Sequence, residues 1–341
     1  MIKPISELIK LKEYSFLQEE EHLRDKLLFL AYGGSISYGT NTINSDIDLR
    51  GCAFNGKSDL IGLSDFEEVV KSEPDTTIYS FNKLIGLLVN VNPNTCELLG
   101  CRPEHIMICH PIAQEMIDNQ IMFLSQRAKK SFSGYAIQQL RRLQNAVGRE
   151  RGTDEMKRMH AINSINHAWS TPGGIAERHL LPADVLMFNF DEDSKLSISI
   201  GSNQKLYNFD AIRLSSALSE VNHIVKTYDK LNHRNNKKSE DGLNKHAQHL
   251  IRLYLMAIDI FEKEKIITYR ENDLDLLRSI RNGRYMNEDG TYQQEFFDMV
   301  DEYEKQLEYA TENTSLPVHP DMKRIEDFVM YVNERVIKDE L

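Results

Sequence analysis

The feature that most restricts the fold is residues 28–54, where two apolar segments are joined by a glycine-rich turn and a polar loop. Residues 27–32 are apolar and end abruptly at Gly33-Gly34-Ser35, which is typical of a buried strand that enters a tight turn. Glycine allows backbone N–H groups to approach a ligand closely, and successive exposed N–H groups form an anion-binding concavity. This stretch therefore predicts a sheet whose first turn binds phosphate.

Residues 46–50 form the second informative pattern, because charged and apolar side chains alternate there. The alternation predicts a half-buried strand with Asp46, Asp48 and Arg50 on one face. Next-but-one side chains on one face lie roughly 6.5 to 7 Å apart, a spacing that suits two carboxylates sharing divalent cations. Mg²⁺ usually takes one or two carboxylates, waters and substrate phosphates. Each motif by itself also fits a simpler interpretation, a common turn or the solvated face of a strand.

Together the two motifs resemble a known active-site signature. Gly34-Ser35, a loop of ten residues and then Asp46-Ile47-Asp48-Leu49 are similar to the signature of the DNA polymerase β-like nucleotidyltransferase superfamily. The longer string, with Tyr38-Gly39-Thr40 in the loop and Arg50-Gly51 after the aspartates, resembles one branch, the RNA repair pathway DNA polymerase β-like family. The resemblance implies an NTP substrate, two Mg²⁺ ions held by carboxylates, and phosphate contacts from Gly34 and Ser35. Arg50 would pair with the aspartates or hold a phosphate.

The resemblance also implies a third carboxylate on a strand beside the first two. Asp75 is the first candidate, as metal ligand and as base, because it opens a run of β-branched and aromatic residues. Glu73 and Glu97 are its rivals. Residues 71–80 are expected to form one strand, and Ser80 is expected to cap a helix with apolar positions at Phe81, Leu84, Ile85 and Leu88.

A later helix offers a group of cations. On a helix that includes residues 245–253, Lys245, His249 and Arg252 fall within about 60° of one another. The opposite side carries apolar residues, namely Leu250, Ile251, Tyr254, Ile258 and Phe261. The simpler interpretation is a solvated face. Because this helix and residues 269–283 resemble the C-terminal motif of the same branch, the functional interpretation is a cationic wall over the nucleotide.

The remaining chain is read more coarsely. Residues 15–26 are expected to form a helix before the first strand, and residues 114 onward are mainly helical. Residues 185–190 and 196–200 read as a β-hairpin, and residues 232–241 as a polar loop.

Charge is distributed unevenly along the chain. The formal net charge of −11 argues against a generic nucleic-acid binder. Residues 127–158, however, hold nine bases against three acids, a local charge of +6 that would suit an RNA backbone or simply a solvated helix face. The nine bases are Arg127, Lys129, Lys130, Arg141, Arg142, Arg149, Arg151, Lys157 and Arg158.

Hydropathy and cysteine spacing indicate the cellular compartment of the protein. No run approaches the roughly eighteen apolar residues of a membrane span, and the first ten residues lack the apolar core of a signal peptide. The four cysteines have no paired CxxC spacing, so reduced thiols are expected. A cytoplasmic protein with no membrane partner is predicted.

These patterns predict an α+β protein. A small mixed β-sheet nucleotidyltransferase core with flanking helices is expected in residues 1–125, followed by a mainly helical domain in residues 126–341 with an inserted β-hairpin at about 150–240. The expected reaction transfers an NMP from an NTP to an acceptor hydroxyl and releases pyrophosphate. The acceptor is an RNA end, a protein hydroxyl or a small molecule, and the alternative is a protein that binds nucleotide or RNA without catalysis.

Overall fold

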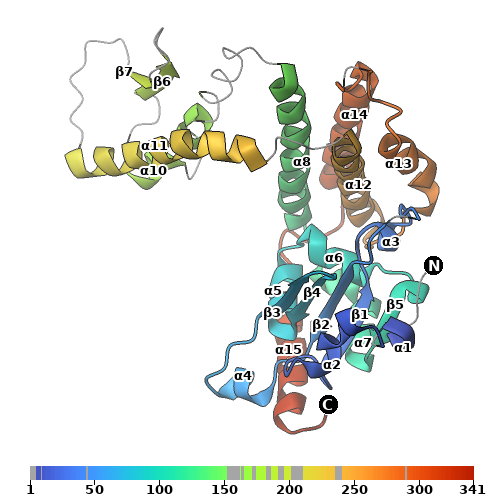
Figure 1. The fold of residues 1–341 in the computed structure, drawn as a ribbon. Coiled ribbons are helices and arrows are strands. Elements are labelled where there is room, and N and C mark those ends of the chain that lie inside the picture. The colour runs from blue at the N-terminus through green and yellow to red at the C-terminus, as the bar shows by residue number, and fades with distance from the viewer. Residues whose placement is uncertain are drawn as a thin grey trace. The chain divides into compact units, whose positions relative to one another are not determined.

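The computed structural model describes residues 5–8, 10–43, 45–151, 162, 165–170, 174–181, 186–190, 196–200, 210–234, 240–288 and 290–341. The chain divides into two compact units, which we describe one at a time. The first combines Met1–Arg141 with Asn244–Leu341, and the second is Arg142–Leu243 (Figure 1).

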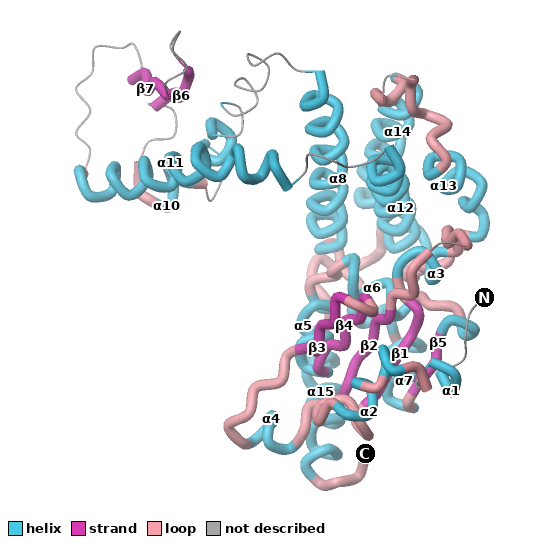
Figure 2. The backbone as a smooth tube through the Cα atoms, in the orientation of Figure 1, coloured by secondary structure: helices cyan, strands magenta, loops and turns pink. Residues whose placement is uncertain are grey.

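A five-stranded mixed sheet forms the centre of the first unit (Figure 2). Its strands are β1 (Leu27–Tyr32), β2 (Leu49–Ala53), β3 (Glu68–Ser72), β4 (Asp75–Ser80) and β5 (Ile106–Cys109), in the order β3-β4-β2-β1-β5. Strands β2 and β4 are parallel, and the other neighbours are antiparallel. With its flanking helices, this sheet confirms the predicted α+β class.

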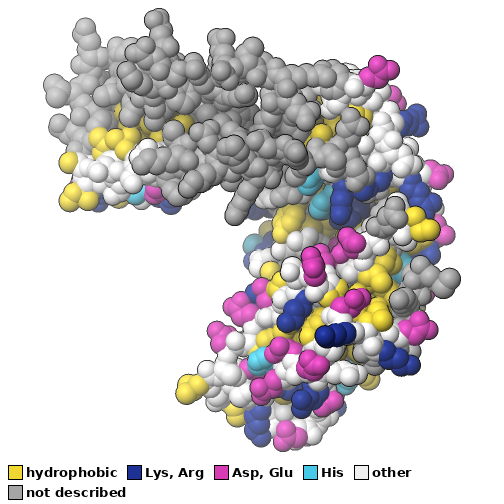
Figure 3. Space-filling view, viewed as in Figure 1, with side chains coloured by type: hydrophobic (Ala, Val, Ile, Leu, Met, Phe, Trp, Pro, Cys, Tyr) yellow, Lys and Arg dark blue, Asp and Glu magenta, His cyan; other side chains and the backbone are white. Residues whose placement is uncertain are grey.

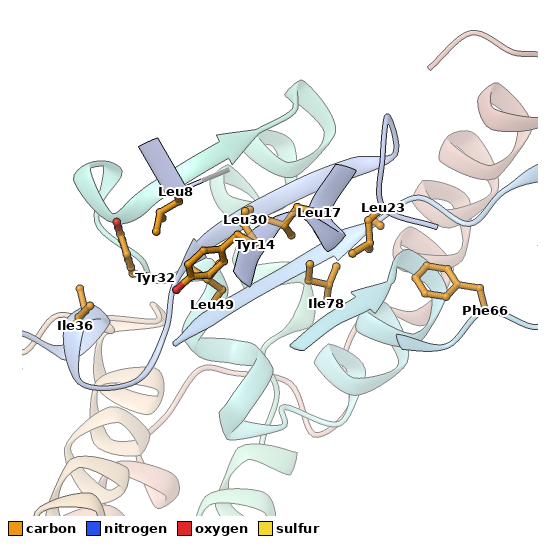
Figure 4. Close-up of a cluster of buried hydrophobic side chains, with 11 residues drawn as sticks. Leu8, Tyr14, Leu17, Leu23, Leu30, Tyr32, Ile36, Leu49, Phe66 and Ile78 are labelled. Carbon is orange, nitrogen blue, oxygen red and sulfur yellow. The ribbon is translucent and has the colours of Figure 1, made fainter. Parts of the chain in front are cut away.

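The N-terminal segment covers one face of the sheet. It contains α1 (Ile5–Leu8), the 3-10 helix η1 (Lys12–Tyr14) and α2 (Phe16–Glu19). Figure 4 shows its apolar side chains packed against the strands, and the buried cluster comprises Leu8, Tyr14, Leu17, Leu23, Leu30, Tyr32, Ile36, Leu49, Ala53, Phe66 and Ile78. The predicted helix over residues 15–26 was wrong beyond its first turn, because the chain bends through residues 20–26 to enter β1.

Helices α5 (Phe81–Val89), α6 (Pro93–Leu99) and α7 (Pro111–Asp118) belong to the other side of the sheet, with α15 (Met322–Ile337) from the end of the chain. The predicted cap of α5 is confirmed, since the Ser80 hydroxyl accepts a hydrogen bond from the Lys83 N–H at 3.3 Å. The ring of Phe81 contacts that of Phe328 on α15, with centroids 6.0 Å apart. Residues from both ends of the chain therefore share this core.

Two strand predictions need correction. Residues 71–80 form a turn and a strand of a hairpin rather than one strand, because β3 and β4 pair antiparallel with Ser72 opposite Asp75. Pro74 lies in the turn, where its missing N–H removes no ladder bond. Strand β2 begins at Leu49, so Asp46 and Asp48 lie in the extended segment immediately before it.

The C-terminal part of the first unit is helical. Helix α12 (Glu240–Lys263) is followed by the 3-10 helix η4 (Glu271–Asp273), α13 (Leu274–Arg281) and α14 (Gln294–Glu312). The predicted apolar side of α12 is buried at every position named, Leu250, Ile251, Tyr254, Ile258 and Phe261. Other elements of this unit are α3 (Gly34–Tyr38), α4 (Lys57–Ile61), η2 (Pro103–His105), η3 (Gln120–Phe123) and the first part of α8 (Arg127–Arg151).

The second unit has its own core. Strands β6 (Leu186–Phe190) and β7 (Leu196–Ile200) pair antiparallel, which confirms the predicted hairpin, and α10 (Ile175–Arg178) and α11 (Ala211–Arg234) complete the named elements. Trp169 is buried against Phe188, with ring centroids 5.0 Å apart. The predicted polar loop at 232–241 was too long, since α11 extends to Arg234 and α12 begins at Glu240, and residues 235–239 lie outside the described residues.

Among the helices that the structure describes, none combines the length and hydrophobicity needed to span a bilayer.

Candidate active site

The glycine-rich turn leads directly into the short helix α3. Gly33 precedes the helix in an extended conformation, and its N–H donates to the Asp48 carbonyl at 2.8 Å. Gly34 has φ of +55°, in the left-handed region that favours glycine. At the other end Gly39, with φ of +77°, terminates the helix. The two glycines therefore confine α3 to five residues and tie its start to the aspartate segment.

Gly34 and Asp48 are in direct contact. A Cβ atom built on Gly34 would lie 1.8 Å from Asp48 Oδ2 and 2.8 Å from its carboxyl carbon. Only a residue without a side chain allows this approach. The fold thus brings the glycine-rich turn and the aspartate pair together, although ten residues separate Ser35 from Asp46.

Asp75 lies at the corresponding end of the neighbouring strand. In the parallel pairing of β2 and β4, Leu49 is opposite Thr76, so Asp48 and Asp75 each come one residue before the paired positions. Asp46 is exposed and Asp48 half-buried. All three predicted carboxylates are therefore found at one edge of the sheet.

Arg50 on β2 forms a bidentate ion pair with Asp75, the first residue of β4. Its Nη1 lies 3.1 Å from Asp75 Oδ1, and its Nη2 lies 3.2 Å from Asp75 Oδ2. Nη1 also donates to the carbonyls of Leu49, at 2.9 Å, and Asp75, at 3.2 Å. Of the two roles that the sequence left open for Arg50, pairing with an aspartate is the one observed in this arrangement.

The surroundings of Asp48 shift the pKa of its carboxyl group. Burial raises its pKa, and the charge of Asp75 and more weakly that of Asp46 act in the same direction. Arg50 and Lys245 lower it. Helix α12 therefore brings the Lys245 ammonium group within electrostatic reach of Asp48, some two hundred residues away in sequence.

The donor types at this edge fit a hard divalent cation. Mg²⁺ prefers anionic oxygens and usually takes one or two carboxylates, and a cation would relieve the repulsion among Asp46, Asp48 and Asp75. Within the described parts of the chain, no three acidic, histidine or cysteine side chains converge on a point that could hold a metal. Asp75 is instead engaged by Arg50. The residues therefore suit a metal held by Asp46 and Asp48, which Asp75 would join on leaving Arg50.

The rival third carboxylates lie elsewhere. Glu73 is in the exposed turn between β3 and β4. Glu97, on α6, is buried and accepts a hydrogen bond from the Tyr38 hydroxyl. Since Asp75 is the member of the trio placed beside Asp48, the geometry favours it over both rivals.

The predicted cationic face of α12 has three different environments. Lys245 is exposed and His249 half-buried. Arg252 is stacked on Tyr38, its guanidinium carbon 3.3 Å from the ring centroid, and its Nε is buried without a hydrogen-bond partner.

The predicted phosphate ligand Ser35 is half-buried in the first turn of α3, and its carbonyl accepts from the Thr40 N–H at 2.9 Å.

The basic segment is only partly described. Helix α8 covers residues 127–151, and residues 152–158 lie outside the described residues. The Arg127 guanidinium donates to the Val89 carbonyl at 3.3 Å, so it also anchors α8 on α5. On the face shown in Figure 3, basic and acidic side chains are interspersed over the sheet rather than segregated.

Sequence reasoning missed the residues that surround the end of α3. The Arg278 guanidinium donates to the Gly39 carbonyl at 3.0 Å, and the ring of Tyr269 leaves no room for a side chain at Gly39. Tyr38 reaches Glu97, 59 positions away. The only signal in the sequence was that Tyr38-Gly39 and residues 269–283 each resembled the same branch.

Comparison with known proteins supports the motif-based interpretation. A family model described as the RNA repair pathway DNA polymerase beta family matches residues 8–162, a range that includes the turn, the three aspartates and Glu97. The match ends before α12, so the resemblance of residues 245–283 stays a prediction. No curated protein and no solved structure matches the chain. The similarity of this chain to the RNA repair pathway DNA polymerase beta family therefore extends over residues 8–162, which include the whole candidate site except the residues of α12 and those that follow it.

Proposed function

We propose that this protein is a Mg²⁺-dependent nucleotidyltransferase that moves an NMP from an NTP to an acceptor hydroxyl, with an RNA end as the acceptor. The observation that carries the proposal is the contact between Gly34 and the Asp48 carboxylate, with Lys245 within electrostatic reach. A glycine-rich turn that can bind phosphate, carboxylates that can bind a metal and an exposed lysine in one place are what phosphoryl chemistry on a triphosphate requires.

In the proposed reaction the acceptor oxygen attacks the α-phosphorus of the NTP. The bond from that phosphorus to the bridging oxygen breaks, and pyrophosphate leaves with the electron pair. Asp75 takes the proton of the hydroxyl. Bound Mg²⁺, held by Asp46 and Asp48 with Asp75, would supply electrostatic stabilisation of the attacking and leaving oxygens. The N–H of Gly34 and the Ser35 hydroxyl bind the outgoing phosphates.

RNA is favoured as the acceptor by two observations. The matched family is named for RNA repair, and residues 127–158 carry a local charge of +6. Phosphate backbones are bound through such clusters of lysine and arginine.

The test is to incubate the protein with Mg²⁺, each α-labelled NTP in turn and an RNA that has a free 3′ hydroxyl. We expect labelled RNA and an equal amount of pyrophosphate. An RNA with a 3′-deoxy end is the matched control, because it lacks only the attacking group. If pyrophosphate is released but the label is found in a protein or a small molecule, that molecule and not RNA is the acceptor. No pyrophosphate from any NTP with any acceptor in a cell extract would contradict the proposal.

Lys245 is expected to bind the triphosphate from the α12 side. Replacing it with Ala should raise the NTP dissociation constant by about fivefold to 150-fold, the effect of losing a charge-assisted contact worth about 1 to 3 kcal/mol. Lys263→Ala is the matched control on the same helix, since its ammonium group instead pairs with Asp259 at 2.6 Å. Calorimetric titration of the Mg²⁺-loaded variants measures the difference. Equal affinities in the two variants would remove Lys245 from the site.

A further inference from the structure

The helix α3 is too short to hold its own position. It has five residues, the first of which is Gly34 with positive φ, and it ends at Gly39, which also has positive φ. An isolated helix of that length is unstable in water because nucleation is costly. Its contacts with the rest of the fold must therefore determine where it lies. This matters because its first two residues, Gly34 and Ser35, are those proposed to bind phosphate.

The far end of α3 is held by a buried polar group. Tyr38 is almost fully buried, and its hydroxyl donates to Glu97 Oε2 on α6. On the ring of the same tyrosine lies the guanidinium of Arg252 from α12, at 3.3 Å. Three helices that are far apart in sequence thus meet at one side chain.

Glu97 is itself fixed in place by its neighbours. The carbonyl of Glu97 accepts from the Thr268 hydroxyl at 2.6 Å and from the Cys101 thiol at 3.3 Å. The Thr268 N–H donates to the Gly100 carbonyl at 3.2 Å, which ties the end of α6 to the segment after α12. Contacts with Thr268 and Cys101 therefore hold the backbone of Glu97, whose carboxylate accepts the hydrogen bond from Tyr38.

We propose that Glu97 and Arg252 are positioning residues that act through Tyr38 to fix α3, and with it Gly34 and Ser35, against Asp48. Because the rise per residue is about 1.5 Å, the two ends of α3 are only about 6 Å apart, so a shift at Tyr38 reaches the turn. Gly34 in turn lies so close to the Asp48 carboxylate that no side chain would fit between them. This inference rests on the proposed function only for its catalytic consequence, since the fixing of α3 can be measured without turnover.

This role for Arg252 differs from direct phosphate binding. Its guanidinium is stacked on an aromatic face and its nearest opposite charge is that of Glu97. An arginine held in this way supports the tyrosine through a cation–π contact. Loss of Arg252 is therefore expected to lower turnover more than nucleotide affinity, unlike loss of Lys245.

The first test uses Tyr38→Phe and Glu97→Gln alone and together. Tyr38→Phe removes the donor of the bond, and Glu97→Gln replaces the carboxylate acceptor with a weaker neutral amide oxygen. Each change should therefore lower kcat about tenfold with a much smaller change in KM, and the double variant should be no slower than the slower single one. Tyr254→Phe is the matched control, a buried tyrosine on the opposite side of α12, and should leave kcat within about twofold. Effects on kcat that multiply in the double variant would overturn the proposal.

Hydrogen exchange of the backbone amides supplies a readout that does not need activity. The N–H groups of Gly39 and Thr40 bond to carbonyls of Ile36 and Ser35, so they report the integrity of α3. We expect at least tenfold faster exchange at these amides in Tyr38→Phe and Glu97→Gln, and no change in Tyr254→Phe. Unchanged exchange would overturn the positioning role. If the wild-type protein transfers no nucleotide but the exchange result holds, the proposed function fails and the positioning role stands.

The ionisation of Glu97 gives a separate prediction. Burial raises its pKa to about 7, against the opposing charge of Arg252, and the other titratable groups that face it are Tyr38 and Cys101. A carboxyl with a raised pKa in the folded state contributes stability at low pH that is lost as pH rises from about 4.5 to about 7. Glu97→Gln, which stays neutral, should therefore have a higher Tm relative to wild type at pH 8 than at pH 5. A difference in Tm that does not vary with pH would show that Glu97 is not desolvated.

Discussion

Replacing Asp46 and Asp48 together with Asn is expected to abolish nucleotidyl transfer while leaving the fold intact. Asn keeps the size and polarity of Asp but removes the anionic oxygens that a hard cation needs. Charge stabilisation by a bound metal is worth several kcal/mol in such reactions, so transfer should fall by at least about 10³-fold. Turnover measured with saturating Mg²⁺ and NTP gives the result directly.

The same double variant should separate metal binding from folding. Mg²⁺ binding to the folded state stabilises it, so added Mg²⁺ should raise the Tm of the wild type but not of the variant. Without metal the variant should melt at a higher temperature than wild type, because Asp48 is a half-buried carboxylate beside other negative charges. A matched control is Asp298→Asn with Asp301→Asn on α14, which makes the same change in net charge at exposed positions. Near wild-type transfer in the Asp46 and Asp48 variant would remove the metal site from this edge of the sheet.

Gly34→Ala is expected to have the second largest effect. The new Cβ would meet Asp48 Oδ2 at 1.8 Å, and the backbone at φ of +55° is strained for any residue with a side chain. Strain of this kind costs about 1 to 3 kcal/mol, and it can be relieved only by moving α3 or the Asp48 carboxylate. We expect transfer to fall at least about a hundredfold, since displacements of about 1 Å can have effects of that size.

The control for this variant is Gly86→Ala. Gly86 lies in the exposed face of α5, where an added Cβ meets nothing within 4 Å. Because alanine is favoured over glycine in a helix by about 1 kcal/mol, this variant should be slightly more stable and fully active. Circular dichroism and Tm measurements on both variants would show whether Gly34→Ala has kept its fold. An active Gly34→Ala variant would mean that the contact with Asp48 is not needed for the reaction.

The part of the site that was readable from sequence is the part encoded locally. Gly34, Ser35, Asp46 and Asp48 fall in one stretch, where turn chemistry and period-two alternation are both visible. The same reasoning failed at residues 71–80, because the β-branched and aromatic residues after Pro74 predicted a strand and the turn at Pro74 was not recognised. Local propensity identifies extended backbone but does not say where the chain reverses.

The helical periodicity of α12 was equally informative and equally incomplete. It placed Lys245, His249 and Arg252 on one face, and it identified the buried face correctly. It could not show that Arg252 is covered by Tyr38 whereas Lys245 is exposed. The burial of each residue on a helix face depends on the elements that pack against that part of the helix. The bond from Tyr38 to Glu97 joins positions 59 residues apart and depends on the tertiary fold alone.

The discontinuous first unit has a consequence for synthesis of the protein. The sheet and α3 are complete within the first 141 residues, but Arg252, Tyr269 and Arg278, which contact the end of α3, follow only after the whole second unit has been translated. At about 5 to 20 residues per second, the ribosome needs roughly 7 to 27 seconds to translate from residue 141 to Arg278. During this time the nascent chain carries its aspartates without the residues that contact the end of α3. Under the proposed function, the chain therefore becomes competent for transfer only after translation has passed the end of α13.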